Sequence, residues 1–219
     1  MRWRSGVRGL GVVLAVGVLG TVGSGCSGAK GADPGASQAS SSTASGPASA
    51  GPGGSAAPDG SAAPAGGTVG AQGSACPLPV GFSVARGWKA KGVDARFEQG
   101  GLVLGCEVDA KPAGHVGFLR VWVADRAPGD ARVVLQNFLA TVKATGTPSV
   151  TDTTAGALPA VEALYEATGV DGPKQERALA VLTPSGAAVV LHLGGLDTAE
   201  HRAMLPAYQL ARQSLTAAP

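Results

Sequence analysis

The three cysteines, Cys26, Cys76 and Cys106, are the residues of this 219-residue sequence whose types and spacing could do chemistry. Cys26 follows an apolar segment and precedes a stretch of small residues, whereas Cys76 and Cys106 lie in the more varied second part of the chain. Outside the cytoplasm two such thiols usually oxidise to a disulfide. Two cysteines without a neighbouring histidine make a poor zinc set, so we expect no metal site.

Residues 1–25 have the pattern of a secretory signal peptide. Arg2, Arg4 and Arg8 precede an uncharged segment whose apolar centre, LGVVLAVGVLG, is about half the ~20 residues that a membrane-spanning helix needs. A basic start, a short apolar centre and small residues after it are typical of export. The sequence GSGC that ends at Cys26 resembles the lipobox of bacterial lipoproteins, in which the cysteine is acylated before cleavage.

An acylated Cys26 accounts for the odd number of cysteines, because Cys76 and Cys106 then form a pair. We expect that pair to be a structural disulfide, whose closed loop of about 30 residues stabilises the domain by roughly 3–4 kcal/mol. Diacylation of Cys26 supplies the two chains that stable anchoring requires, on the extracytoplasmic face of the cell membrane. The alternative is an ordinary secreted protein in which Cys26 itself joins a disulfide.

Composition divides the rest of the chain into a linker and one domain. Residues 26–75 are almost entirely Gly, Ala, Ser and Pro, so they bury too little apolar surface to fold, and we expect a disordered tether. Residues 76–219 have the length of a single domain. They contain 13 basic and 13 acidic residues, a neutral balance that argues against a nucleic-acid partner.

Residues 76–219 are predicted to form strands first, then a helix, then strands and a final helix. The expected strands lie within residues 81–90, 95–110, 115–125, 160–170, 176–182 and 187–195, with the expected helices at 129–146 and 197–218. Asp130 and Asp197 are the predicted N-caps. Because Pro206 lacks an amide hydrogen, we expect the last helix to begin near it, after one short turn. This order predicts an α+β fold, an antiparallel β-sheet covered by helices.

The sequence FSV followed by Gly87-Trp88, together with an amphipathic last helix, resembles the PsbP-like fold over about residues 80–217. The resemblance is closer to the LpqN-type lipoproteins of actinobacteria. PsbP-like domains act mostly as adaptors or accessory subunits and share no catalytic residues. The resemblance therefore implies a non-enzymatic domain without a cofactor, and an envelope protein as its partner.

The histidines and two of the tryptophans are the remaining candidates for a functional site. His115, His192 and His201 share no metal spacing; we expect His192 to be a buried sheet residue and His201 to be solvated. Trp88 and Trp122 could line a ligand groove or partner surface, but tryptophans are more often core residues. An adaptor is thus the first hypothesis, a carrier or sensor of a small apolar ligand the second, and an envelope hydrolase the third.

Overall fold

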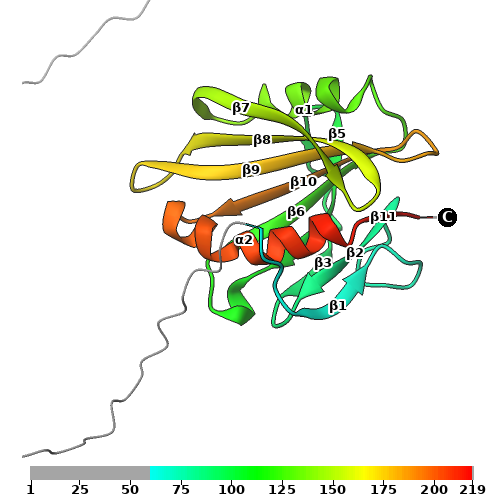
Figure 1. Cartoon of the computed structure of the whole chain (residues 1–219), viewed down its shortest axis with the longest axis horizontal. Helices are drawn as coiled ribbons and strands as arrows, with labels where there is room; N and C mark the ends of the chain where they lie inside the picture. The colour runs from blue at the N-terminus through cyan, green and yellow to red at the C-terminus, as the bar shows by residue number, and fades with distance from the viewer. Residues whose placement is uncertain (1–59, 219) are drawn as a thin grey trace, which may run out of the picture. The chain divides into compact units, whose positions relative to one another are not determined.

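The computed structural model describes residues 60–218, and the expected signal peptide, Cys26 and most of the expected linker lie outside this range (Figure 1). The first strands are β1 (Ala65–Val69), β2 (Val80–Ala85), β3 (Lys89–Gly92), β4 (Glu98–Gln99), β5 (Leu102–Asp109) and β6 (Gly117–Ala124). Helix α1 (Ala131–Leu139) follows, then β7 (Ala144–Ala155), β8 (Leu158–Thr168), β9 (Pro173–Leu182) and β10 (Ala188–Gly195). Helix α2 (Thr198–Gln213) and strand β11 (Thr216–Ala217) come last.

Two antiparallel sheets make up most of the fold. The large sheet has eight strands in the order β3-β5-β6-β10-β9-β8-β7, with β4 also paired to β5 (Figure 1). The small sheet has the order β1-β2-β11. Strands β7, β8, β9 and β10 follow one another as three antiparallel hairpins, which together form a meander. Strand β10 also pairs with β6.

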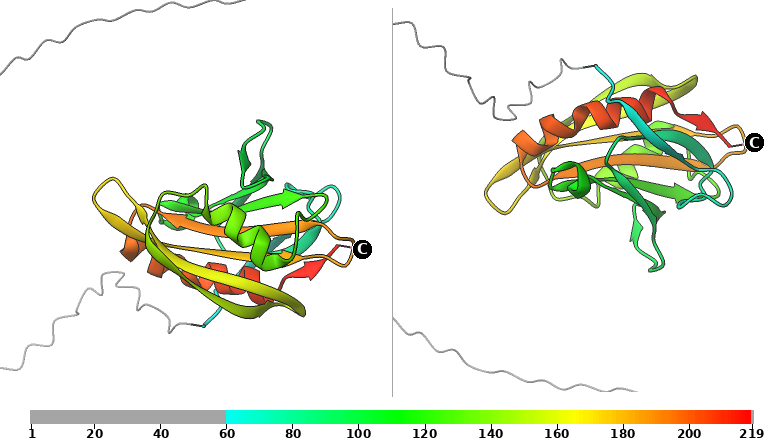
Figure 2. Two further views of the ribbon diagram at one scale, coloured as in Figure 1. Left: turned by 90° about the horizontal axis from the view of Figure 1, so that it is seen from above. Right: turned by 90° about the horizontal axis from the view of Figure 1, so that it is seen from below.

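The helices cover the large sheet only in part, so the α+β fold is dominated by its sheets. Helix α2 and the small sheet lie against one face, and α1 lies against the other (Figure 2). The sheet therefore separates two cores, the α2-side core and the α1-side core. Every residue of β10 is buried, because this central strand faces both cores.

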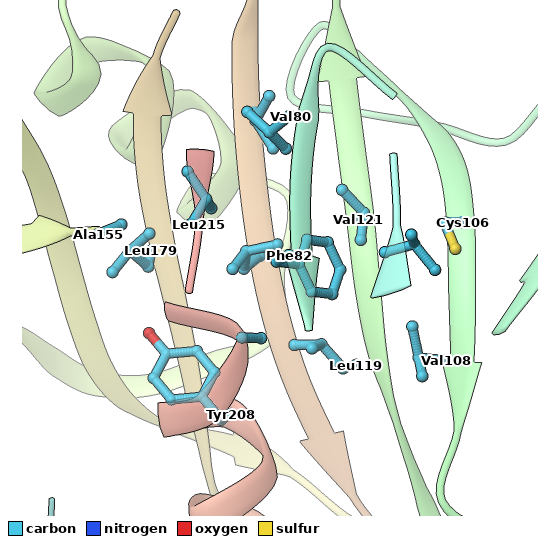
Figure 3. Close-up of a cluster of buried hydrophobic side chains, with 14 of the residues drawn as sticks. Val80, Phe82, Cys106, Val108, Leu119, Val121, Ala155, Leu179, Tyr208 and Leu215 are labelled. Carbon is cyan, nitrogen blue, oxygen red and sulfur yellow. The ribbon is translucent and has the colours of Figure 1, made fainter. Parts of the chain in front are cut away.

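The α2-side core is the larger of the two. Phe82 from the small sheet, Leu119 from the large sheet and Tyr208 from α2 meet there (Figure 3). In the α1-side core, Phe138 of α1 packs against Trp122 of β6, with ring centroids 6.0 Å apart. These apolar contacts stabilise a domain whose helices are too short to be stable alone.

A β-bulge in β5 positions the disulfide. The register against β6 shifts between Leu104 and Cys106, so Leu104 faces the α1-side core and Cys106 the α2-side core. Without the extra residue, Gly105, the alternation of the strand would direct both side chains to one face. Cys106 is thereby turned toward Cys76, with which it forms a disulfide whose Cα atoms are 5.6 Å apart.

The ordered fold begins before Cys76, which differs from the expected boundary at residue 75. Strand β1 lies within the expected linker and pairs with β2, and Val69 at its end is buried in the α2-side core. Ahead of it, the amide of Ala63 donates to the carbonyl of Pro206, 2.8 Å away. Val69 is the one branched aliphatic residue of that segment, and its burial explains where the linker gives way to the domain.

The prediction for the first helix was right about its start and wrong about its end. Asp130 is the N-cap and its carboxylate accepts from the amide of Val133. The helix stops at Leu139, and strand β7, which was not predicted, begins at Ala144. Gly146 and Pro148 lie at an irregularity of this edge strand, where proline is tolerated because no neighbouring strand needs its amide.

The prediction for the last helix was likewise right about its cap and wrong about Pro206. Asp197 accepts from the amide of Glu200, and the helix then runs without a break through Pro206 to Gln213. An interior proline costs about 3 kcal/mol. Met204 and Tyr208, one on each side of it, are fully buried, and their packing outweighs that cost.

Candidate functional site

The two tryptophans singled out in the sequence occupy packing positions. Trp88 is half-buried against the α2-side core, and Trp122 is buried beneath α1. Neither tryptophan is among the residues that line five of the surface cavities on residues 60–218. Both pack as core residues do.

The structure instead reveals a row of polar side chains that crosses the α1 side of the large sheet. Glu107 of β5 lies opposite Arg120 of β6, and Arg120 lies opposite His192 of β10. Glu176 of β9 and Tyr165 of β8, which lie opposite each other, continue the row. Phe138 of α1 packs edge-on against the His192 ring, so the row lies at the edge of the sheet area that α1 covers.

The carboxylate of Glu176 is the centre of this row, which we call the Glu176 cluster (Tyr165, Lys174, Glu176 and His192). Lys174 Nζ lies 2.8 Å from one carboxylate oxygen, and His192 Nε2 lies 3.0 Å from the other. The Tyr165 hydroxyl donates to that second oxygen over 3.2 Å. Lys174 also donates to the carbonyl of Gly195, so its ammonium is held from two sides.

Electrostatics fix the protonation states of this cluster. Burial alone would raise the pKa of Glu176, but the hydrogen bonds and charges of His192 and Lys174 outweigh it and lower that pKa to about 2. Burial, and then the charge and hydrogen bond of Glu176, raise the pKa of Tyr165 far above its ordinary value. At neutral pH Glu176 is thus ionised and Tyr165 keeps its proton.

These states suit structure better than proton transfer. An efficient general base has a pKa near the working pH, whereas Glu176 is far too weak a base and Tyr165 far too weak an acid. Both oxygens of the Glu176 carboxylate and the Tyr165 hydroxyl are also bonded within the cluster. Among residues 60–218, no three His, Cys, Asp or Glu side chains gather where they could hold a metal ion.

Next to the cluster lies an exposed apolar surface. Val116 and Leu196 are 54% and 45% exposed, and the amide of Leu196 donates to the carbonyl of Val116 over 2.9 Å. They border a hollow of about 240 Å³ whose floor includes Phe118, Arg120 and Glu176. We call this surface the Val116–Leu196 patch.

The remaining histidines differ from each other. His192 is the buried sheet residue that was expected, whereas His201, expected to be solvated, is only 1% exposed. His201 lies on the same side of α2 as Met204 and Tyr208, three and seven residues further on, so helical periodicity could have placed it in the core. His115 is half-buried and pairs with Glu200, with 3.3 Å between Nδ1 and the carboxylate.

Fold and site together describe a small, sheet-dominated α+β domain with a disulfide and a charge-paired polar cluster. The model of the lipoprotein family Lipoprotein_23, described as an uncharacterised lipoprotein, matches residues 45–215. This chain belongs to that family. No curated protein matches its sequence. Within the described residues, 60–218, the structure contains no helix of the length and apolar character needed to cross a membrane.

Two solved structures of the kinds expected from the sequence are similar to this chain. One is the solution structure of the cyanobacterial PsbP protein CyanoP from Synechocystis, at 12% identity and a TM-score of 0.46, covering 64% of this chain and 87% of that one. The other is LpqN of Mycobacterium tuberculosis, described as involved in cell envelope biogenesis. It shares 19% identity at a TM-score of 0.35, covering 68% of this chain and 76% of LpqN.

Proposed function

We propose that this protein is an exported lipoprotein, anchored through acylated Cys26 to the extracytoplasmic face of the membrane, whose domain binds an envelope protein without catalysing a reaction. Membership of a lipoprotein family supports the anchor. The segment between Cys26 and β1 then links the anchor to the domain. The observation that carries the binding role is the Val116–Leu196 patch, an apolar surface beside a cluster whose charges are already paired.

The patch has the composition of a recognition surface. Exposed apolar side chains that adjoin one another and are bordered by polar groups mark contact sites between proteins. Here Val116 and Leu196 form the apolar part, and Arg120 and Lys174, which also line the hollow, add charged groups that a partner can contact. Because Lys174 and Arg120 are held by Glu176 and Glu107, this surface is rigid and loses little entropy on binding.

The binding role is tested by crosslinking in cells that produce the full-length protein, followed by quantitative mass spectrometry of the crosslinked proteins. Leu196→Asp is the test variant, and Phe97→Asp is the matched control, because Phe97 is 54% exposed but lies in the loop between β3 and β4. We expect Leu196→Asp to lower the yield of a specific crosslinked protein by about tenfold or more, as for a residue central to an interface. Equal yields from the two variants would exclude the patch as the binding surface.

The anchor is tested separately. The intact mass of the protein extracted from its own membranes should include acyl chains on Cys26, and Cys26→Ala should release the protein from the membrane. An unmodified cysteine in the mature protein would contradict the anchor and leave the patch proposal unaffected.

A further inference from the structure

A second polar cluster lies on the opposite side of β8 and β9, beneath α2. The Glu162 carboxylate of β8 accepts from the Tyr208 hydroxyl of α2 over 2.6 Å. Arg177 of β9 approaches its other oxygen at 3.4 Å, and Arg212 of α2 approaches the first at 3.7 Å. Arg212 is further held by the Thr154 carbonyl, 2.9 Å from its Nε. We call these four side chains the Glu162 cluster (Glu162, Arg177, Tyr208 and Arg212).

The Glu162 cluster carries one more positive charge than negative. Two guanidinium groups share one carboxylate, and within residues 60–218 neither arginine forms an ion pair with any other acidic residue. The Nε–H group of Arg177 is buried and has no hydrogen-bond partner among the described residues. A partly buried guanidinium that lacks a full set of acceptors is costly, so the site is incomplete as the chain alone builds it.

A cavity of about 520 Å³ opens beside the two arginines. It is lined by Gly60, Thr154, Gly156, Arg177, Gln209, Arg212 and Gln213. This volume lies within the range of small-molecule sites, about 300–1,000 Å³. Gln209 is only 8% exposed, lines the cavity and makes no side-chain hydrogen bond to the described part of the chain. The Gln209 amide is not among the fully buried, unpartnered polar atoms of the described residues, so it is accessible from the cavity and can bond to a ligand there.

The turn between β7 and β8 helps to form this cavity. Gly156 has φ +53°, and a Cβ there would lie 1.9 Å from the carbonyl oxygen of Leu215. Its amide donates to the Arg212 carbonyl over 2.8 Å. Glycine thus allows the hairpin to approach the end of α2 and places Thr154 and Arg212 on the same wall.

We propose that this cavity binds a small, strongly polar molecule through a carboxylate or phosphate group. The guanidinium of Arg177 supplies charged donors in a planar fork that matches such oxygens, and the amide of Gln209 adds a neutral donor. The single excess positive charge is neutralised by one such group. The thiols and tryptophans noted in the sequence take no part. This inference goes beyond the proposed protein-binding role, because the cavity and the Val116–Leu196 patch lie on opposite sides of the large sheet.

Isothermal titration calorimetry of the full-length protein in a non-ionic detergent tests the proposal. Inorganic phosphate and glucuronate are the probes, one for each kind of anionic group. We expect saturable binding of at least one of them, with Kd between about 10 μM and 10 mM. The ratio of the two affinities then distinguishes a phosphate ligand from a carboxylate ligand.

Three variants localise the binding. Arg177→Gln should weaken it by about tenfold or more, and Gln209→Met, which keeps the size of the side chain and leaves no charge unpaired, by about three- to tenfold. Arg202→Gln is the matched control, since Arg202 is an exposed arginine that lies on α2, as Gln209 does, but outside the cavity. This variant should bind like the wild type. Thermal unfolding shows whether each variant is folded. If Arg177→Gln does not fold, the affinity of Gln209→Met alone shows whether the cavity is the binding site.

Two results would overturn the proposal. One is the absence of saturable heat with both probes in the folded wild-type protein. The other is an equal loss of affinity in Arg202→Gln and Gln209→Met, which would mean binding to the general positive charge of the surface. Neither result bears on the crosslinking of the Val116–Leu196 patch, so the two proposals can fail independently.

Discussion

A tyrosine–glutamate hydrogen bond lies on each side of strands β8 and β9, buried on the α1 side and partly buried on the α2 side. On the α1 side Tyr165 donates to Glu176, and on the α2 side Tyr208 donates to Glu162. Each carboxylate is also flanked by basic side chains, Lys174 and His192 in the first case and two arginines in the second. The arrangements are alike in their parts, but only the second contains a buried donor without a partner among the described residues, the Nε–H group of Arg177.

The partners of the buried donors indicate what each cluster does. In the Glu176 cluster, Lys174 and His192 each contact one carboxylate oxygen, the Tyr165 hydroxyl donates to the second oxygen, and no buried side-chain atom of the cluster lacks a partner among the described residues. The Glu162 cluster has a surplus guanidinium and a cavity beside it. Similar polar residues in one sheet thus hold the fold together on one side and are available for recognition on the other.

Removing the central carboxylate of the complete cluster should have the largest effect. Glu176→Gln removes the counterion of the partly buried Lys174 ammonium and the buried carboxylate at the centre of the cluster, and we expect the free energy of unfolding to fall by about 3 kcal/mol. Urea unfolding followed by tryptophan fluorescence measures this change. Glu107→Gln is the control, since that ion pair with Arg120 is about one-third exposed and should contribute about 1 kcal/mol or less. Equal losses from the two variants would refute the assignment of Glu176 as the structural centre.

The pH dependence of stability should report on His201. Burial, and then the positive charge of Arg177, lower the pKa of its imidazole in the folded state from 6.5 to about 4. The unfolded chain therefore binds the extra proton first, and stability that is complete above pH 6.5 should be lost as the pH falls toward 4, by about 3 kcal/mol. Urea midpoints measured at a series of pH values test this. His201→Leu should remove the loss in that window, and an unchanged pH profile would contradict the burial of His201.

Below that window the same measurement should report on Glu176. Its pKa is lowered from 4.5 to about 2 in the folded state, so its contribution to stability is present above pH 4.5 and is lost as the pH falls toward 2. Glu176→Gln should flatten the profile between pH 4.5 and 2, and it should lower the pKa of His201 further, because the charge of Glu176 raises that pKa. A variant profile that keeps its slope below pH 4.5 would assign the acid sensitivity to other carboxylates.

The tyrosine hydroxyls should have the smallest and most informative effects. Tyr208→Phe removes a short bond to Glu162, and we expect a loss of about 1.5–3 kcal/mol, as for hydrogen bonds to charged groups. Tyr165→Phe removes the longer bond to Glu176, which keeps Lys174 and His192, so the expected loss is about 0.5–1.5 kcal/mol. Thermal unfolding of the two variants gives the comparison. The reverse order would mean that the Glu176 cluster depends on its tyrosine more than its geometry indicates.

Local signals in the sequence predicted local structure well. The caps Asp130 and Asp197 were identified because a cap bonds to an amide three residues away. Strand β7 was missed because its sequence, ATGTPSVTDTTA, is polar and contains Gly and Pro, which an exposed edge strand tolerates but a central strand does not. The continuation of α2 through Pro206 depends on packing against the sheet, which no local rule contains.

The two polar clusters could not be assembled from the sequence for a related reason. Their strands, β8, β9 and β10, follow one another in the chain, but the pairs within them depend on the register of these strands and on the docking of α2, which the sequence does not specify locally. A signal was present: Arg120 and His192 are single polar residues within apolar strands, the pattern of groups that must find partners inside the fold. The partners themselves are fixed by the strand order of the sheet.

The difference between the two sides of the sheet can be measured most directly from the arginine Nε–H resonances of Arg177 and Arg120 in the NMR spectrum of the full-length protein, titrated with phosphate and with glucuronate. Our account predicts that the resonance of Arg177 shifts and saturates with at least one of them. It also predicts that the resonance of Arg120, whose Nε is already bonded to Glu107 over 2.7 Å, stays in place. A saturating shift of Arg120 with none at Arg177 would show that recognition and structural support had been assigned to the wrong sides of the sheet.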